Sequence, residues 1–188
     1  GLLCAYMLDR DGVDYVMIEA DRICHGVTQN TTAKITSQHG LIYDKLIREF
    51  DVETARAYWE VNEAAIGEYR SMAREIDCDF ETRDNYIYCT DSAAPLVNEM
   101  GALKRLGIPA DYVEETDLPI PTAGAIRFNN QAQFHPLKFA AYICQGLNIY
   151  EQTKALEFLG NTVVTSGGRV TASKIIMATH FPILNKHG

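Results

Sequence analysis

The chain has 188 residues, is 47% hydrophobic and carries a formal net charge of -8 at pH 7. This length can bury one sizeable core or two small ones, so a globular fold is expected. The acidic balance, the absence of a basic run and the absence of an apolar run of membrane-spanning length disfavour a nucleic-acid-binding surface and a membrane span.

The first 19 residues have the pattern of half a dinucleotide-binding unit. Gly1 opens an apolar helix, Asp11-Gly12 forms a turn, and an apolar strand over residues 15–18 ends in Glu19. A helix that starts at a glycine presents free N–H groups and its positive dipole end to a pyrophosphate, with no side chain in the way. An acid at the end of the next parallel strand can accept hydrogen bonds from ribose hydroxyls. The segment predicts a nucleotide site, although other α/β proteins show the same pattern.

A loop rich in small and hydroxyl-bearing residues follows. Its glycine permits close backbone approach, its threonines offer donors, its alanine leaves room for a flat ring, and its lysine adds a cation. Such a loop suits an anionic ligand, and it is equally compatible with an ordinary polar connection. The residues expected to contact a ligand here are Gly26, Thr28, Thr31, Thr32, Ala33 and Lys34.

Two helices are expected next, over residues 41–49 and 52–76. In the second, apolar residues recur at spacings of three, four or seven, which is typical of a helix with one buried face. Trp59 is therefore expected in the core. The apolar stripe consists of Val52, Ala55, Trp59, Ile66, Tyr69, Met72 and Ile76.

Residues 78–90 have strand character, interrupted by an expected turn at Asp84-Asn85. Residues 93–106 then form a helix that stops at Gly107. Another strand, over residues 125–128, is expected to end in a turn at Asn129-Asn130.

Pro136 is expected in the first turn of the following helix, where a missing N–H costs nothing. The rest of the chain has β-forming content, with turns at Gly160-Asn161 and Gly167-Gly168. Strands are expected over residues 148–152, 155–158, 162–165 and 174–178.

Residues 19–40 read Glu-Ala-Asp-Arg-Ile-Cys-His-Gly-Val-Thr-Gln-Asn-Thr-Thr-Ala-Lys-Ile-Thr-Ser-Gln-His-Gly and closely resemble the D-amino-acid oxidase family of flavoenzymes, of the glycine and sarcosine oxidase type. In that family the strand-end acid holds the FAD ribose, and the loop beyond it wraps the pyrophosphate and flavin. The resemblance implies that FAD is the cofactor and that Ala20 and Arg22 also belong to its site.

The resemblance is also strong over residues 134–182. Residues 175–180, Ile-Ile-Met-Ala-Thr-His, resemble the second cofactor-facing strand end of the family, which places Ala178 and Thr179 at the FAD site. His180 stands where a glycine often occurs, so a backbone contact there does not carry over. Read alone, the segment is a buried strand of a parallel sheet.

The resemblance implies an α/β fold: a partial Rossmann-like FAD-binding domain with an inserted α+β segment of a substrate domain. The expected segments are 1–50 for the first part of the FAD-binding domain, 51–133 for the insertion, and 134–188 for the return. The implied reaction is oxidation of a small amine or amino acid by hydride transfer to the flavin, followed by hydrolysis of the imine. No catalytic residue carries over, because family members anchor the substrate mostly with groups beyond the last residue of this sequence.

Two alternatives remain open at this stage. A nicotinamide-dependent dehydrogenase would use the same helix and Glu19, but it should continue with further strand–helix repeats. A non-catalytic nucleotide-binding fragment is the other alternative, because the sequence begins at Gly1 without the preceding strand and glycines of the phosphate turn. The isolated chain is therefore expected to be inactive, to bind FAD weakly, to expose apolar surface and to self-associate. Its opening helix is expected to bury Leu2, Leu3, Tyr6 and Met7 against a sheet.

The five cysteines are scattered and include no C-x-x-C pair. This usage suits reduced thiols in a cytoplasmic protein better than a disulfide framework or a zinc site. The histidines are no more clustered, so no metal site is expected. His25, His39 and His180 are interpreted as polar loop residues.

Overall fold

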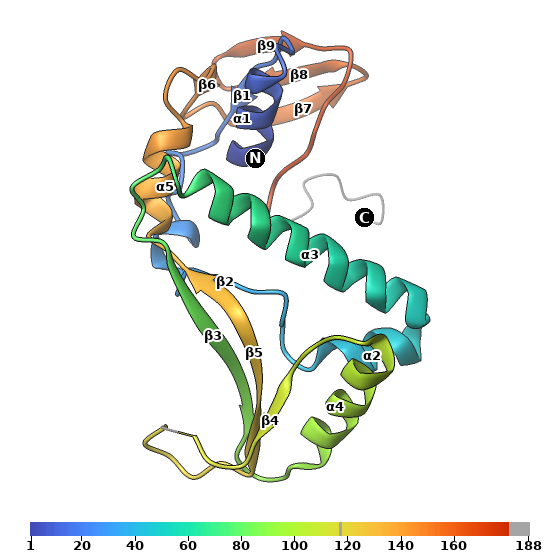
Figure 1. Ribbon diagram of the computed structural model, residues 1–188. Coiled ribbons are helices and arrows are strands. Elements are labelled where there is room, and N and C mark those ends of the chain that lie inside the picture. Colours follow the sequence, from blue (N-terminus) through green and yellow to red (C-terminus); the bar gives the residue numbers. More distant parts are fainter. Residues whose placement is uncertain (117, 181–188) are drawn as a thin grey trace. The chain divides into compact units, whose positions relative to one another are not determined.

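The computed structural model describes residues 1–116 and 118–180 and contains two compact units. Unit 1 consists of residues 1–31 and 136–188, and unit 2 of residues 32–135 (Figure 1). Unit 2 covers residues 32–135, whereas the insertion was expected over residues 51–133. The assignment of the segments to FAD-binding and substrate domains stays a prediction. Residues 181–188 of the expected third segment lie outside the described residues. Over the described part of the chain, no helix is both long and apolar enough to cross a membrane.

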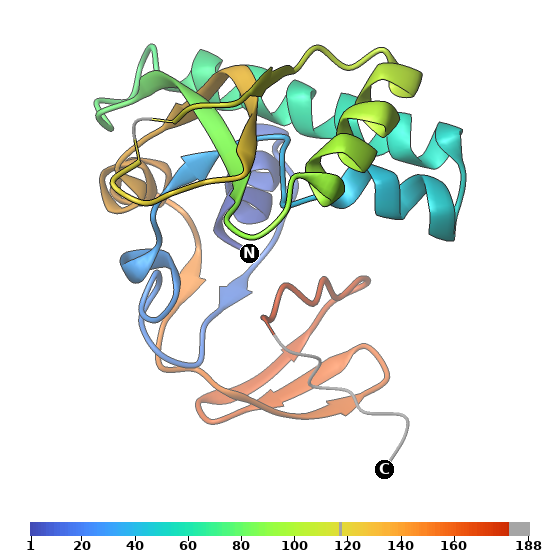
Figure 2. The ribbon, with the colours of Figure 1, turned by 90° about the horizontal axis from the view of Figure 1, so that it is seen from below.

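Unit 1 combines a parallel strand pair with an antiparallel three-stranded sheet (Figure 2). The parallel pair joins β1 (Met17–Ile18) to β6 (Ile149–Tyr150). Two α-helices and a short 3-10 helix belong to the same unit: α1 (Leu2–Arg10), α5 (Pro136–Ile143) and η1 (Thr28–Asn30). The antiparallel sheet has the order β7 (Ala155–Leu159), β8 (Thr162–Thr165) and β9 (Gly168–Thr171).

Three expectations for unit 1 need correction. Helix α1 buries Ala5, whereas Met7, expected in the interior, is 51% exposed and Leu2, Leu3 and Tyr6 are half-buried. Residues 174–178 form no strand, because no described segment pairs with them, and Ile176 is 62% exposed. Strand β9 was not expected, since its sequence Gly-Arg-Val-Thr has weak strand character.

Unit 2 contains an antiparallel sheet in which β5 (Gly124–Gln133) is the common partner. Strand β3 (Glu81–Cys89) pairs along the whole of β5, and the two long strands run side by side in Figure 1. Strand β2 (Lys34–Ile35) pairs with one end of β5, and β4 (Asp111–Val113) pairs nearer the other end. Three helices accompany the sheet: α2 (Ile42–Glu49), α3 (Val52–Met72) and α4 (Ala94–Leu106).

The two turns expected within the sheet lie instead at a single irregularity in the pairing of β3 with β5. Strands β3 and β5 continue through Asp84-Asn85 and Asn129-Asn130, with a register shift between Arg83 and Asn85. Asn130 has φ +58, which a short polar side chain tolerates. Its backbone is held on both sides, because its N–H donates to Asp84 Oδ1 (3.3 Å) and its carbonyl accepts from Arg70 Nη2 (2.9 Å). These distant partners keep the strand running where local propensity favours a turn.

The main core of unit 2 lies between the three helices and one face of the sheet. Strand β5 contributes Ile126 and Phe128, and Trp59 of α3 packs at the edge, partly buried. Helix α4 ends at Gly107, whose φ of +69 is the left-handed conformation of a glycine C-cap, as expected. The buried members of this core are Tyr43, Ala55, Leu96, Ala102, Leu103, Leu106, Ile108, Ile126 and Phe128.

A buried carboxylate from α4 caps the start of α2. Glu99 is 1% exposed, and its two oxygens accept the backbone N–H groups of Tyr43 (2.9 Å) and Asp44 (2.8 Å). Helix α2 has no capping side chain at its own N-cap, Leu41. Burial raises the pKa of the Glu99 carboxyl, while the two N–H donors act in the opposite direction. Glu99 therefore satisfies N–H groups that would otherwise be buried without partners.

We predict that Glu99→Gln loosens the first turn of α2. An amide can accept only through Oε1, so its NH₂ would face a backbone N–H and leave it unsatisfied, at a cost of about 1–3 kcal/mol. Hydrogen–deuterium exchange at residues 42–46 should become faster. Glu60→Gln makes the same chemical change at an exposed site of α3 and should leave these amides unchanged. Equal exchange in the Glu99 variant and the wild type would contradict this role.

Candidate functional site

The start of α1 lies close to Met17 of β1 and to Ala178. A Cβ on Gly1 would lie 3.2 Å from Met17 Cε and 3.6 Å from Ala178 Cβ. The structure therefore brings two predicted site residues, Gly1 and Ala178, to the same place. Helix α1 has no capping side chain, so its first N–H groups face outward with the positive end of the helix dipole.

Glu19 directly follows β1. Its N–H donates to Tyr150 O (2.9 Å), which continues the parallel pairing with β6 by one residue. One carboxylate oxygen, Oε1, accepts from Asp21 N (3.0 Å). Among the described residues no group donates to Oε2. The acid thus has a fixed backbone and retains accepting capacity for hydroxyl groups.

The loop after Glu19 is fastened to the segment after β6. Glu151 Oε1 accepts from Ile23 N (2.8 Å), and Asp21 O accepts from Gln152 N (2.8 Å). These contacts join residues far apart in sequence, so no local pattern could have revealed Glu151. The predicted residues Ala20 and Arg22 are exposed in this loop.

Cys24 lies beside Glu19 in the same unit, with an uncommon φ of +61. Burial, followed by the nearby Cys144 and Glu19, raises the pKa of its thiol. Cys24 therefore remains a neutral thiol at physiological pH and adds no negative charge beside Glu19. The side chain of His25, interpreted as a polar loop residue, contacts Asp21: His25 Nδ1 lies 3.0 Å from Asp21 Oδ2.

The next part of the loop is compact. Gly26 has φ +113, which suits glycine, and its carbonyl accepts from Asn30 Nδ2 (2.8 Å). Thr28 opens the 3-10 helix η1, and Thr31 follows that helix. The donors, the glycine and the uncapped end of α1 in unit 1 fit the chemistry of an anionic dinucleotide.

The remaining loop residues belong to unit 2. Thr32 is exposed, Ala33 is 9% exposed with φ +54, and Lys34 begins β2 with an exposed side chain. Thr179 follows Ala178 in unit 1 and is exposed. All predicted cofactor residues thus have described positions, and their roles stay predictions.

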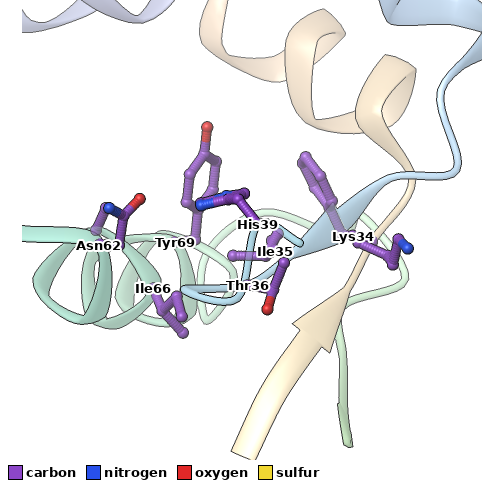
Figure 3. Close-up of a pocket in the computed structure, with 9 residues that line it drawn as sticks. Lys34, Ile35, Thr36, His39, Asn62, Ile66 and Tyr69 are labelled. Atoms are coloured by element: carbon purple, nitrogen blue, oxygen red, sulfur yellow. The ribbon is translucent and has the colours of Figure 1, made fainter. Parts of the chain in front are cut away.

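Unit 2 also contains a cavity of about 210 Å³ that sequence reasoning did not find. It lies between the segment that begins at β2 and helix α3 (Figure 3). Of the predicted residues only Lys34 lines it, and His39 had been interpreted as a loop residue. The lining consists of Lys34, Ile35, Thr36, His39, Asn62, Ala65, Ile66, Tyr69 and Phe134.

A buried polar network fixes the chain beside this cavity. Ser37 is fully buried, and its N–H donates to Gln131 Oε1 (2.7 Å) on β5. Its hydroxyl donates to Glu63 Oε1 on α3 (2.6 Å). The Tyr43 hydroxyl donates to Ser37 O (2.6 Å). Because these partners lie on β5, α3 and α2, the network holds the neighbouring residues Thr36 and His39 on the cavity wall.

The cavity wall has further fixed contacts. Tyr58 Oη and His39 Nδ1 are 2.7 Å apart, so one ring nitrogen of His39 is engaged. Tyr69 and Phe134 form an aromatic pair with ring centroids 5.6 Å apart. Burial raises the pKa of both the Tyr58 and Tyr69 hydroxyls, which therefore keep their protons. Within the ranges that the structure covers, no group of three or more His, Cys, Asp or Glu could hold a metal ion.

Comparisons of sequence and of structure both find proteins that are similar to this chain. The putative Rieske 2Fe-2S iron-sulfur protein YhfW of Bacillus subtilis is 36% identical over 201 residues, covering 100% of this chain and 40% of that protein. L-proline dehydrogenase from P. horikoshii matches with a TM-score of 0.68 at 16% identity, over 90% of this chain and 47% of that one. Glycine oxidase from Geobacillus kaustophilus matches with a TM-score of 0.65 at 17% identity, over 92% of this chain and 50% of that one.

The chain thus spans half or less of the length of these proteins. The likeness in fold confirms the expected α/β architecture with an FAD-binding fold. The sequence matches the family described as FAD dependent oxidoreductase over residues 1–184. This chain belongs to the FAD-dependent oxidoreductase family that includes D-amino-acid oxidase.

Proposed function

We propose that the full-length protein oxidises an amine or amino acid by transferring hydride to FAD. The family match over residues 1–184 is the observation that carries this proposal. The two similar structures are named for an oxidase of glycine and a dehydrogenase of L-proline, both of which act on amino acids. An FAD-dependent family also favours FAD over the nicotinamide-dependent alternative.

Residues of unit 1 would hold the adenosine end of the cofactor. Among the described residues no group donates to Oε2 of Glu19. The Glu19 carboxylate would therefore accept hydrogen bonds from the ribose hydroxyls. The uncapped start of α1 would direct N–H groups at the pyrophosphate, and the small Gly1 would allow close approach. The loop over residues 20–31 would supply further donors.

When bound, the flavin supplies the acceptor for the hydride that leaves the carbon beside the nitrogen. The residues of this chain would position the cofactor and would not react themselves. The tethers from Glu151 and Tyr150 hold the loop and Glu19 before any ligand arrives, so little ordering entropy is lost on binding. No residue of this chain is proposed to react with the substrate.

A second proposal concerns the route of the electrons. The Bacillus subtilis relative with 36% identity is named for a Rieske 2Fe-2S centre. This chain covers 40% of that protein, compared with 47% and 50% of the two solved structures. That protein therefore has room for a further domain. We infer that the full-length protein carries such an iron–sulfur domain outside the present sequence and passes electrons from the flavin to it.

We predict that Glu19→Ala weakens FAD binding by the full-length protein. The change removes charge-assisted hydrogen bonds worth about 1.5–3 kcal/mol, or roughly 10- to 100-fold in affinity. Quenching of flavin fluorescence on titration into apoprotein measures this. Glu157→Ala, an exposed acid on β7, is the matched control. Unchanged affinity in the Glu19 variant would reject its contact with the ribose.

The activity is tested by anaerobic mixing of the full-length protein with glycine, sarcosine, L-proline and methylamine in turn. At least one should bleach the oxidised flavin, because hydride transfer reduces it, and primary amines should then release ammonia on imine hydrolysis. Dithionite serves as the positive control for reduction. A protein whose flavin is reduced by dithionite and by none of these compounds would speak against the proposal.

The iron–sulfur proposal predicts two iron and two acid-labile sulfide per FAD in the purified full-length protein. Reduction by an accepted amine should then yield an electron paramagnetic resonance signal from the cluster as well as reduced flavin. Stoichiometric FAD without iron would show that electrons leave the flavin by another route, with no bearing on the oxidation itself.

A further inference from the structure

Strand β5 has one residue more than β3 where the pairing of these two strands is irregular. To this stretch β3 contributes Asp84 alone, whereas β5 contributes both Asn129 and Asn130. Two residues opposite one is the arrangement of a β-bulge. The second of the two, Asn130, has the left-handed φ of +58. The extra residue of β5 is therefore accommodated by a backbone conformation that asparagine tolerates better than most residues.

The bulge reverses the alternation of side chains along β5. Residues that stand directly opposite each other in an antiparallel pair share a face, and so do residues two apart in one strand. Gln131 stands opposite Arg83, and Phe128 stands opposite Asn85. Arg83 and Asn85 are two apart in β3, so their partners lie on one face of the sheet. Without the extra residue Gln131 would lie on the opposite face from Phe128, because a shift by one residue reverses the faces of a strand.

The face that Gln131 gains is the face that carries the network around Ser37. Gln131 is 3% exposed, and its Oε1 accepts from Ser37 N (2.7 Å). Its Nε2 donates to Glu63 Oε1 (3.3 Å) and to a neighbouring backbone carbonyl (3.2 Å). Tyr43, whose hydroxyl donates to Ser37 O, stacks on Phe128 with ring centroids 6.2 Å apart. Both ends of the Gln131 amide are thus engaged, which fixes its orientation.

The segment that Gln131 holds continues directly from the predicted cofactor loop. Lys34 and Ile35 form β2 and pair with residues 132–133 of β5. Ser37 follows, fully buried, with its N–H on Gln131. The partners that β5 gives to residues 34–37 are thus residues 131–133, and all of them follow the bulge. The course of β5 after Asn130 therefore determines where this segment lies.

We propose that Asn130 and Arg70 are positioning residues for the flavin. Arg70 of α3 donates to Asn130 O (2.9 Å) and holds the bulge, and the bulge aims Gln131 at Ser37. The bond to Ser37 fixes the loop that ends at Lys34. This inference rests on the proposed function, in which that loop wraps the flavin. Asn130 and Arg70 act through Gln131 and do not themselves touch the cofactor.

The first measurement is hydrogen–deuterium exchange at residues 36–38 of the full-length protein. Asn130→Val should speed this exchange by roughly 10-fold, because a β-branched residue does not adopt a φ of +58 without strain. Asn130→Gly should exchange like the wild type, because glycine adopts this conformation readily. Asn129→Val makes the same chemical change at the preceding residue, whose φ is not positive, and should also behave as wild type.

Two further variants leave the backbone of the bulge unchanged. Arg70→Met removes the donor to Asn130 O, and Gln131→Met removes the acceptor of Ser37 N. Each should speed exchange at residues 36–38 by up to roughly 10-fold, the effect of one net hydrogen bond. Arg74→Met, at an exposed arginine just after α3, is the control for Arg70. These variants decide the test if Asn130→Val fails to fold.

The second measurement reads the bound flavin in the oxidised full-length protein without substrate. Asn130→Val, Arg70→Met and Gln131→Met should shift the absorption maxima of the flavin and weaken FAD binding by roughly 10-fold, whereas Asn130→Gly should do neither. Fluorescence titration of the apoprotein measures the affinity. A merely structural role would lower the temperature of unfolding and leave the flavin spectrum and the affinity unchanged.

Each outcome decides the proposal. Unchanged exchange at residues 36–38 in the variants would overturn the link from the bulge to Ser37. Faster exchange with an unchanged flavin spectrum and unchanged FAD affinity would overturn the link to the cofactor. Both readings precede any reaction, so they stand even if no amine or amino acid reduces the flavin. That result would reject the proposed oxidation and leave the positioning role decided by its own measurements.

Discussion

The sheet of unit 2 depends on hydrogen bonds to one strand, β5. One edge of this strand pairs along its whole length with β3, and the other edge divides between β2 and β4. Its buried side chains, Ile126 and Phe128, also form the sheet side of the core. Loss of the β5 register would therefore move core residues and three strand partners together, because a shift by one residue reverses the faces of a strand.

The same strand determines the wall of the cavity. Gln131 projects from β5 to the N–H of Ser37 (2.7 Å) and so fixes the segment between β2 and α2, which carries Thr36 and His39. Helix α3 adds its own contact through Glu63 and supplies the opposite wall. In unit 1 the equivalent task falls to the parallel pairing of β1 with β6, which fixes Glu19. In both units, backbone pairing between distant segments positions the polar groups.

Short stretches of sequence were enough to predict where helices begin and end and to recognise the family resemblance. They were not enough to predict features that depend on contacts between residues far apart in the sequence. Gly107 and Pro136 marked helix boundaries correctly, because their effects act within one turn. Asn130 was expected in a turn, yet Asp84 and Arg70 hold it within β5. The cavity is lined by residues around positions 34–39, 62–69 and 134. Their spacing in the sequence follows no helix or strand period, so the sequence alone could not predict the cavity. The assigned roles of the cofactor residues rest on resemblance and await experiment.

The cap that Glu99 provides for α2 has a consequence for how the chain folds. Helix α2 has only eight residues, too few to be stable alone in water, and the carboxylate that satisfies its first turn lies 56 residues further along the chain. The first turn of α2 therefore gains its hydrogen-bond acceptor only when α4 has docked. The two helices are thus stabilised together by a contact between distant parts of the sequence, and contacts of long sequence separation slow folding.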